Sequence, residues 1–262
     1  MLRMDKKPRI GITVGDPSGI GPEIVLKALT EEIVLGACVP VVIGDAQMLS
    51  HQARKLGLTC GHDVVNDNEP LPEHIDRPVI YNLNNLSGNY AIGTENEKSG
   101  RAAAQYIESA VRLCMTRQID AIATAPINKK SLFLAGYSFP GHTEFLQHLT
   151  GSSNVAMGFI TDSLRIILLS THLPLAQAVA LVKKDRIIQI ARLAHQELIR
   201  WGISRPRIAV AALNPHGAEG GLFGIEESSE IMPAIATVNE DPECNVSVPY
   251  SAETVFVRTR AF

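Results

Sequence analysis

Short apolar runs of strand type alternate along this chain with longer amphipathic segments of helix type. Strand-type runs lie at residues 9–15, 38–44, 79–83, 119–125, 155–160, 164–170 and 206–213. Helix-type segments lie at residues 22–36, 45–57, 95–118 and 183–202. The alternation predicts an α/β fold, and the short Thr-Asp-Ser link between residues 160 and 164 predicts a hairpin that makes the sheet mixed.

Local signals predict where one of these helices begins and ends. Asp45 stands where an N-cap is expected, and Gly57 stands where a left-handed C-terminal stop is expected. Composition marks no domain boundary. The cluster of Pro, Asn and Gly at residues 126–140 favours a first domain over residues 1–130 and a second over residues 131–262.

Composition excludes several classes of protein. The chain has 262 residues, of which 45% are hydrophobic, and this is enough for a sizeable core. A net charge of −3 without a basic block predicts no nucleic-acid or membrane partner. The four cysteines form no CxxC pair, so neither a zinc knuckle nor a dithiol site is indicated. We expect a cytoplasmic protein, since no apolar run reaches membrane-span length and the N-terminus has no signal-peptide pattern.

Polar loops follow the buried strands, where ligands gather in open α/β sheets. The first, GDPSGIGPE at residues 15–23, opens a helix and is either an anion cradle or a tight turn. It matches neither the dinucleotide fingerprint nor the P-loop. No GxSxG elbow is present, which disfavours covalent acyl chemistry.

Histidines mark the other loops. His142 and Thr143 stand at an expected helix N-terminus, where they either grip an anionic substrate or cap the helix. HExxH is absent and no PCxxC accompanies His142, which disfavours zincins and zinc deaminases. His172 and His216 each follow an apolar strand. They are either two metal ligands that converge on one rim or two loop histidines hydrogen-bonded to backbone.

Five motifs in order resemble the 4-hydroxythreonine-4-phosphate dehydrogenases, the PdxA family. They are GDPSGIGPEI (15–24), TAPINK (124–129), GHTEF (141–145), LRIILLSTHLPL (164–175) and LNPHGAEGG (213–221). The resemblance implies a two-domain fold of the isocitrate/isopropylmalate dehydrogenase type, with mixed sheets and a cleft between the domains. It also implies a homodimer with the active site near the interface.

The same resemblance implies oxidation of a phosphorylated hydroxy acid by NAD or NADP, followed by decarboxylation, with a divalent metal (Zn, Mg or Co) as Lewis acid. The substrate would be 4-phosphohydroxy-L-threonine of pyridoxine biosynthesis. The alternatives are D-threonate or D-erythronate 4-phosphate, a non-catalytic truncated paralogue, or a transferase like the phosphotransacetylases. Carried over by position, His172 and His216 match metal ligands, and His142 and Thr143 match substrate-binding residues. The general base and the cofactor-binding residues remain unassigned.

The chain departs from the family pattern in two places. It reads Gly217-Ala218-Glu219 where the family usually reads Ala-Gly-Glu. It also stops at Phe262, before the family's third metal histidine, further substrate-binding Lys, Asn and Arg residues, and most cofactor contacts. We therefore expect the C-terminal part of the family fold to be missing, and this polypeptide to bind metal weakly and turn over poorly.

Overall fold

The computed structural model describes residues 7–59, 61–86 and 91–258. The chain packs into two compact units, Met1–Ser152 and Ser153–Phe262, which are described one at a time. The first unit runs past the expected boundary at residue 130. The reason is that α5 (Lys129–Leu134) and α6 (His142–Thr150) pack against α4 (Glu97–Met115) around the buried side chains of Leu132 and Phe145.

The first unit is built on a five-stranded sheet in the order β3-β4-β2-β1-β5. Its strands are β1 (Arg9–Thr13), β2 (Val39–Gly44), β3 (Asp63–Asn66), β4 (Val79–Asn82) and β5 (Ala121–Thr124). Every pairing among them is parallel. The α/β class is confirmed, but the expected mixed sheet is not found here, because helices rather than hairpins link most of these strands.

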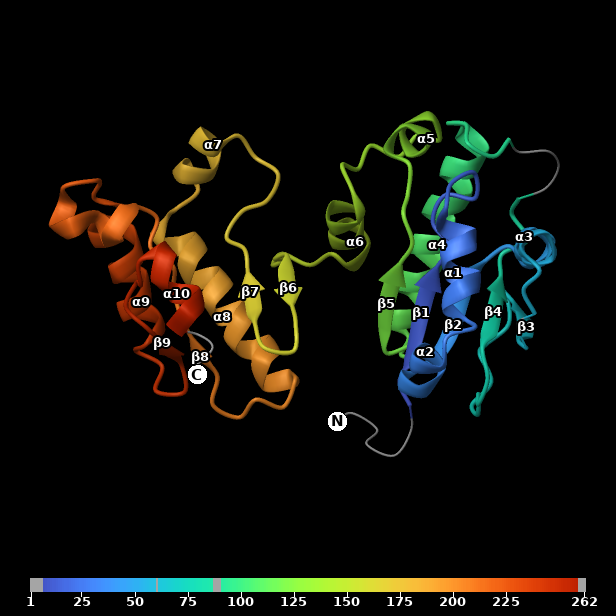
Figure 1. Cartoon of the computed structure of the whole chain (residues 1–262), viewed down its shortest axis with the longest axis horizontal. Coiled ribbons are helices and arrows are strands. Elements are labelled where there is room, and N and C mark those ends of the chain that lie inside the picture. The colour runs from blue at the N-terminus through green and yellow to red at the C-terminus, as the bar shows by residue number, and fades with distance from the viewer. Residues whose placement is uncertain (1–6, 60, 87–90, 259–262) are drawn as a thin grey trace. The chain divides into compact units, whose positions relative to one another are not determined.

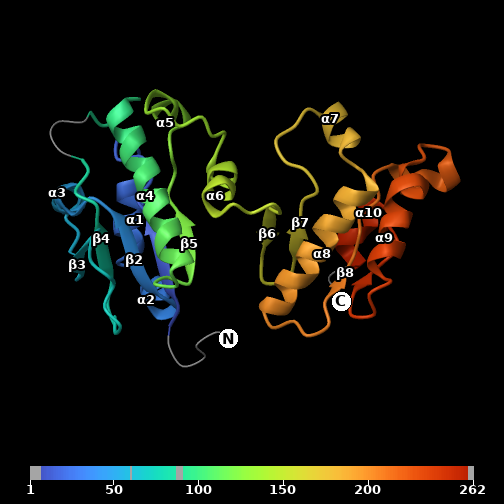
Figure 2. The same ribbon diagram turned by 180° about the vertical axis from the view of Figure 1, so that it is seen from behind.

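Helices cover both faces of this sheet. The two views agree that α1 (Gly21–Ala28) lies on one face and α4 on the other (Figures 1 and 2). The single helix expected at residues 22–36 is two helices, α1 and α2 (Glu32–Ala37), because Glu31 takes an extended conformation between them.

The predicted ends of α3 (Ala46–Leu56) are confirmed. The Asp45 side chain accepts a hydrogen bond from the Met48 N–H, and Gly57 ends the helix with a φ of 65°.

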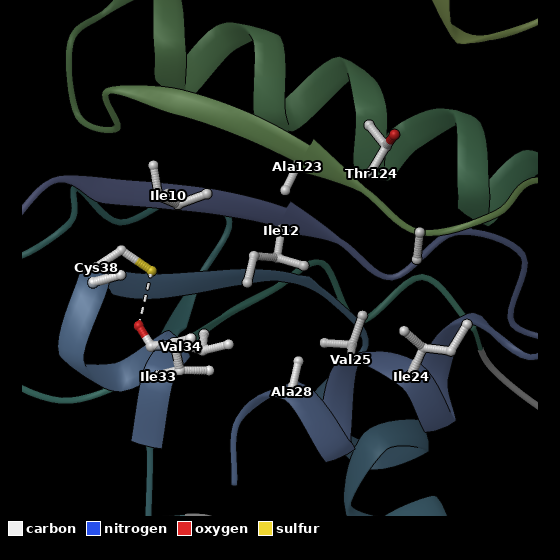
Figure 3. Close-up of a pocket in the computed structure, with 12 residues that line it drawn as sticks. Ile10, Ile12, Ile24, Val25, Ala28, Ile33, Val34, Cys38, Ala123 and Thr124 are labelled. Atoms are coloured by element: carbon white, nitrogen blue, oxygen red, sulfur yellow. Dashed lines mark hydrogen bonds between the residues drawn. The ribbon is translucent and has the colours of Figure 1, made fainter. Parts of the chain in front are cut away.

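An apolar trough of about 500 Å³ lies between the β1–β5 part of the sheet and helices α1 and α2 (Figure 3). Ile10, Ile12 and Ala123 line it from the sheet, and aliphatic side chains of both helices line the other side. Among the described residues that line it, Cys38 alone is ionisable, and its thiol donates to the Val34 carbonyl at 3.5 Å. Burial raises the pKa of this thiol, so the trough offers apolar contact rather than acid–base chemistry.

The second unit joins a hairpin, two parallel strands and a helical layer. The expected hairpin is confirmed as β6 (Gly158–Ile160) and β7 (Arg165–Ile167), closed by the Thr161 N–H donating to the Leu164 carbonyl at 2.8 Å. The remaining elements are α7 (Leu175–Ala180), α8 (Lys184–Arg200), β8 (Arg207–Ile208), α9 (Met232–Val238), β9 (Asn245–Val246) and α10 (Ala252–Arg258). Its core lies between α8 and α9.

The strand expected at residues 206–213 is shorter than predicted. Only β8 pairs in a ladder, with β9, and Ala211 adds an isolated bridge to Tyr250. Within the part of the chain that the structure describes, no helix combines the length and apolar character needed to cross a membrane.

Candidate functional site

The loop that follows β8 has an unusual backbone. Within η1 (Pro215–Gly221), six successive residues from His216 to Gly221 have positive φ. Glycine adopts this left-handed conformation at no steric cost, but an L-residue pays about 1–2 kcal/mol. Three of the six, His216, Ala218 and Glu219, carry a Cβ. Such strain persists only where surrounding contacts over-determine the conformation, and it concentrates at functional sites.

The base of this loop is held by a buried carboxylate. Glu227, at the start of η2 (Glu227–Ile231), is 5% exposed. It accepts hydrogen bonds from the backbone N–H of Leu213 at 2.9 Å and of Asn214 at 2.7 Å. Burial acts to raise the pKa of Glu227, but hydrogen bonds from Asn214 and the Leu213 amide outweigh it and hold the pKa below its usual value. The carboxylate therefore stays ionised as an acceptor.

His172 occupies a similar backbone position in the other predicted metal-binding loop. It follows β7 with a φ of 52°, and His216 has a φ of 54°. Both side chains are exposed, and among the described residues neither imidazole takes part in a hydrogen bond. This disfavours the alternative of two loop histidines bonded to backbone.

Most of the strained backbone that the structure describes lies in the two loops that carry these histidines. The structure describes six non-glycine residues with positive φ: Asn84, Arg117, His172, His216, Ala218 and Glu219. Two are the predicted metal ligands and two more belong to the loop of His216. Exposed imidazoles without hydrogen-bond partners fit a divalent cation as donors.

Among the described residues, neither histidine belongs to a cluster of metal-ligating side chains. Within the described ranges, no group of three or more His, Cys, Asp or Glu side chains could hold a metal ion. That His172 and His216 bind one ion together therefore stays a prediction.

The predicted substrate-binding pair lies in the first unit, at the start of α6. Gly141 is the N-cap residue and makes no side-chain cap, so His142 and Thr143 stand in the first turn of the helix. Burial lowers the pKa of His142, which favours the neutral imidazole. Its Nε2 is buried without a hydrogen-bond partner in the described structure. A buried ring nitrogen without a partner fits a ligand-binding role better than a capping role.

The GDPSGIGPE loop proves to be tightly packed. Gly15 has a φ of 74°, and a Cβ there would collide with the carbonyl of Pro126. The Asp16 N–H donates to that carbonyl at 2.9 Å. The Asp16 side chain is 4% exposed and accepts from the Ser18 N–H at 2.7 Å. Burial raises the pKa of Asp16. These contacts favour the tight-turn alternative over an anion cradle.

Sequence reasoning missed the polar cluster that links this loop to α4. Ser18 Oγ lies 2.5 Å from Ser99 Oγ and accepts from Asn96 Nδ2 at 3.0 Å. Asn96 also caps α4 by accepting from the Ser99 N–H at 2.8 Å. The Asn-x-x-Ser spacing at residues 96–99 is the one local signal that indicates this cap.

Comparison with known proteins assigns the family. The family described as "Pyridoxal phosphate biosynthetic protein PdxA" matches residues 36–261. The chain belongs to the PdxA family. A PdxA relative from Oceanobacillus iheyensis, named putative D-threonate 4-phosphate dehydrogenase, is 38% identical over 98% of this chain and 78% of its own length. One from Trichlorobacter lovleyi, named 4-hydroxythreonine-4-phosphate dehydrogenase, is also 38% identical, over 95% of this chain and 75% of its own.

A solved PdxA structure confirms the fold. The crystal structure of a 4-hydroxythreonine-4-phosphate dehydrogenase from Burkholderia phymatum superposes with a TM-score of 0.88 at 35% identity. The superposition covers 98% of this chain and 78% of the Burkholderia phymatum chain. The predicted fold of the isocitrate/isopropylmalate dehydrogenase type is thereby confirmed, and the relatives place the chain in a family of dehydrogenases.

Proposed function

We propose that this PdxA-family chain is a metal-dependent dehydrogenase that oxidises a small phosphorylated hydroxy acid with NAD or NADP and decarboxylates the product. One observation carries the metal part of the proposal. Of the four non-glycine residues of the second unit described with left-handed backbone, two are His172 and His216, the residues that the family resemblance assigns to the metal. We infer 4-phosphohydroxy-L-threonine, in pyridoxine biosynthesis, as the first candidate substrate.

The alternative substrates use the same chemistry. Relatives at 38% identity are named for D-threonate 4-phosphate as well as for 4-hydroxythreonine 4-phosphate. Both kinds of molecule carry a phosphate, a carboxylate and a secondary alcohol, and they differ in an amine or a hydroxyl. D-erythronate 4-phosphate belongs with the second kind. A direct comparison of substrates decides between them.

The residues of the chain have distinct tasks in this reaction. His172 and His216 would hold a divalent ion such as Zn²⁺, Mg²⁺ or Co²⁺. When bound, the ion would supply Lewis acidity to the alcohol and the ketone, and NAD or NADP would be the hydride acceptor. His142 and Thr143 orient the anionic substrate at the N-terminus of α6 through hydrogen bonds and the helix dipole. A neutral His142, favoured by its lowered pKa, binds without protonating the substrate.

A homodimer is part of the proposal, with the active site near the interface. The β6–β7 hairpin supports it, because Phe159 and Ile160 are 56% and 57% exposed on a two-stranded ribbon. Such a ribbon is only marginally stable until further apolar surface covers it. Light scattering of the purified chain is expected to give the dimer mass, and Phe159→Ser is expected to shift it toward the monomer.

The decisive experiment measures NADH or NADPH formation with added divalent metal, on 4-phosphohydroxy-L-threonine and separately on D-threonate 4-phosphate. We expect a metal-dependent signal that His216→Ala abolishes and that His51→Ala, at an exposed position of α3, leaves unchanged. A folded chain that binds no metal and reduces no cofactor would instead favour the non-catalytic alternative.

A further inference from the structure

Two side chains outside the proposed ligand set close the base of the loop that carries His216. Glu227 Oε1 accepts from the backbone N–H of Leu213 and of Asn214. Its Oε2 accepts from Asn214 Nδ2 at 2.8 Å. Leu213 and Asn214 lie directly before η1, and Glu227 lies directly after the loop. These three hydrogen bonds therefore join the two ends of one loop, and we call them the Asn214–Glu227 clamp.

The packing around Asn214 leaves it little freedom. Its Nδ2 also donates to Glu226 Oε2 at 2.8 Å. A Cβ added at Gly224 would lie 2.5 Å from both Asn214 Nδ2 and Glu226 Oε2. Glycine at this position, with a φ of 151°, lets the backbone come close to the amide. The Asn214 side chain is thus fixed by two carboxylates and by the chain that passes over it.

A closed base explains how the loop keeps a conformation that its own residues disfavour. His216, Ala218 and Glu219 would each relax toward right-handed backbone if the ends of the loop could separate. Outside the clamp, the described hydrogen bonds of the loop are the bond from Asn214 Nδ2 to Glu226 Oε2 and short-range backbone bonds, such as Gly217 N–H to the Asn214 carbonyl at 3.2 Å. The clamp and the bond from Asn214 to Glu226 are therefore the described hydrogen bonds that join the two ends of the loop that carries His216.

We propose that Glu227, acting through Asn214, is a positioning residue that holds His216 in its left-handed conformation and so sets the affinity of this loop for a divalent cation. The inference rests on the proposed metal site. Glu227 does not act as a ligand, because it is buried and both carboxylate oxygens are occupied by hydrogen bonds within the chain.

The test compares Glu227→Gln with a matched control, Glu230→Gln. Glutamine keeps the size of the side chain, but its amide nitrogen donates, so one side of the clamp is lost. Glu230 lies in the same η2 segment and also accepts from a backbone N–H, that of Lys184 at 2.8 Å. It makes an ion pair with Lys183 at 2.9 Å and no described hydrogen bond to residues 213–224.

Two readouts separate positioning from general stability. The first is titration of the metal-free chain with Co²⁺, followed by visible absorption, with Zn²⁺ affinity taken from competition with a chromophoric chelator. The second is hydrogen exchange of a peptide spanning residues 213–224 without metal. We expect Glu227→Gln to weaken metal binding by about 10- to 100-fold, as other residues that orient metal ligands do, and to speed exchange in this peptide. Glu230→Gln is expected to change neither.

The proposal is overturned if Glu227→Gln keeps wild-type exchange in the loop, or if Glu230→Gln loses metal affinity to the same extent. A wild-type chain that binds no Co²⁺ or Zn²⁺ refutes the metal function itself and with it the affinity claim. The exchange result then still decides whether the clamp holds the loop, since it needs no metal.

Discussion

Replacing Gly100 by alanine sets two physical effects against each other in α4. Gly100 is buried where α4 meets α5. A Cβ there would lie 2.7 Å from the backbone nitrogen of Leu132 and closer still to the carbonyl of Ser131. In an open helix the same substitution stabilises by about 1 kcal/mol, because alanine loses less backbone entropy. Here the backbone of α5 stands in the way and cannot rotate aside as a side chain would.

We expect the clash of the added methyl group with the α5 backbone to outweigh the gain in helix propensity. To accept the methyl group, α5 must retreat by roughly 1 Å or more, and overpacking of this kind costs about 3 kcal/mol. The net loss is about 2 kcal/mol, which corresponds to a Tm lower by about 5 °C for a unit of this size. Movement of α5 would also weaken the bond from the Asn96 N–H to Ser131 Oγ, now 3.2 Å.

The assay is thermal unfolding followed by far-ultraviolet circular dichroism, with Gly36→Ala as the matched control. Gly36 lies in α2, and nothing stands within 4 Å of a Cβ built there. Gly36→Ala should therefore raise the Tm by roughly 2–4 °C through helix propensity alone. If Gly100→Ala matches or exceeds the wild-type Tm, the close approach of α4 and α5 described here is wrong.

Three further substitutions test other parts of the structure. Glu219→Gly removes an exposed L-residue from left-handed backbone and should raise the free energy of unfolding by up to about 1 kcal/mol in urea titrations; an unchanged or lower value would contradict the left-handed assignment. Asp45→Ala removes the N-cap of α3 and the acceptor of the Leu86 N–H at 3.2 Å, and should cost about 1–2 kcal/mol in the same assay. The imidazole of His142 should titrate below pH 6.5 in NMR. Because the pKa of His142 is lower in the folded chain than in the unfolded chain, the stabilisation from the neutral imidazole is complete above pH 6.5. It is lost as pH falls through the folded pKa. His142→Gln should abolish this loss of stability at low pH.

The sequence predicted structure correctly where residues close together in the chain determine it. It failed where pairing with a segment distant in the chain determines it. The ends of α3 follow from Asp45 and Gly57, which act within one turn of the helix. Strand β3 was not predicted, because its four residues include two polar ones and Val64 is 51% exposed. It exists as an edge strand because β4 offers a free edge for pairing.

The residues of the candidate site could be predicted from the sequence, but their backbone conformation could not. The sequence alone placed His142, His172 and His216 directly after glycine or apolar segments, and the motifs around them identified the family. It did not indicate that His172 and His216 adopt left-handed backbone, because local preference for L-residues opposes that conformation.

By itself, then, the sequence determined the α/β alternation, the ends of the best helices and the identity of the candidate ligands. Periodicity, capping and turn chemistry act over a few residues and can be seen in the chain. Only the tertiary structure decided the shape of the His216 loop. That shape depends on Glu227 bonding to Asn214 across the whole loop, and such a contact forms only after both ends of the loop have been brought together.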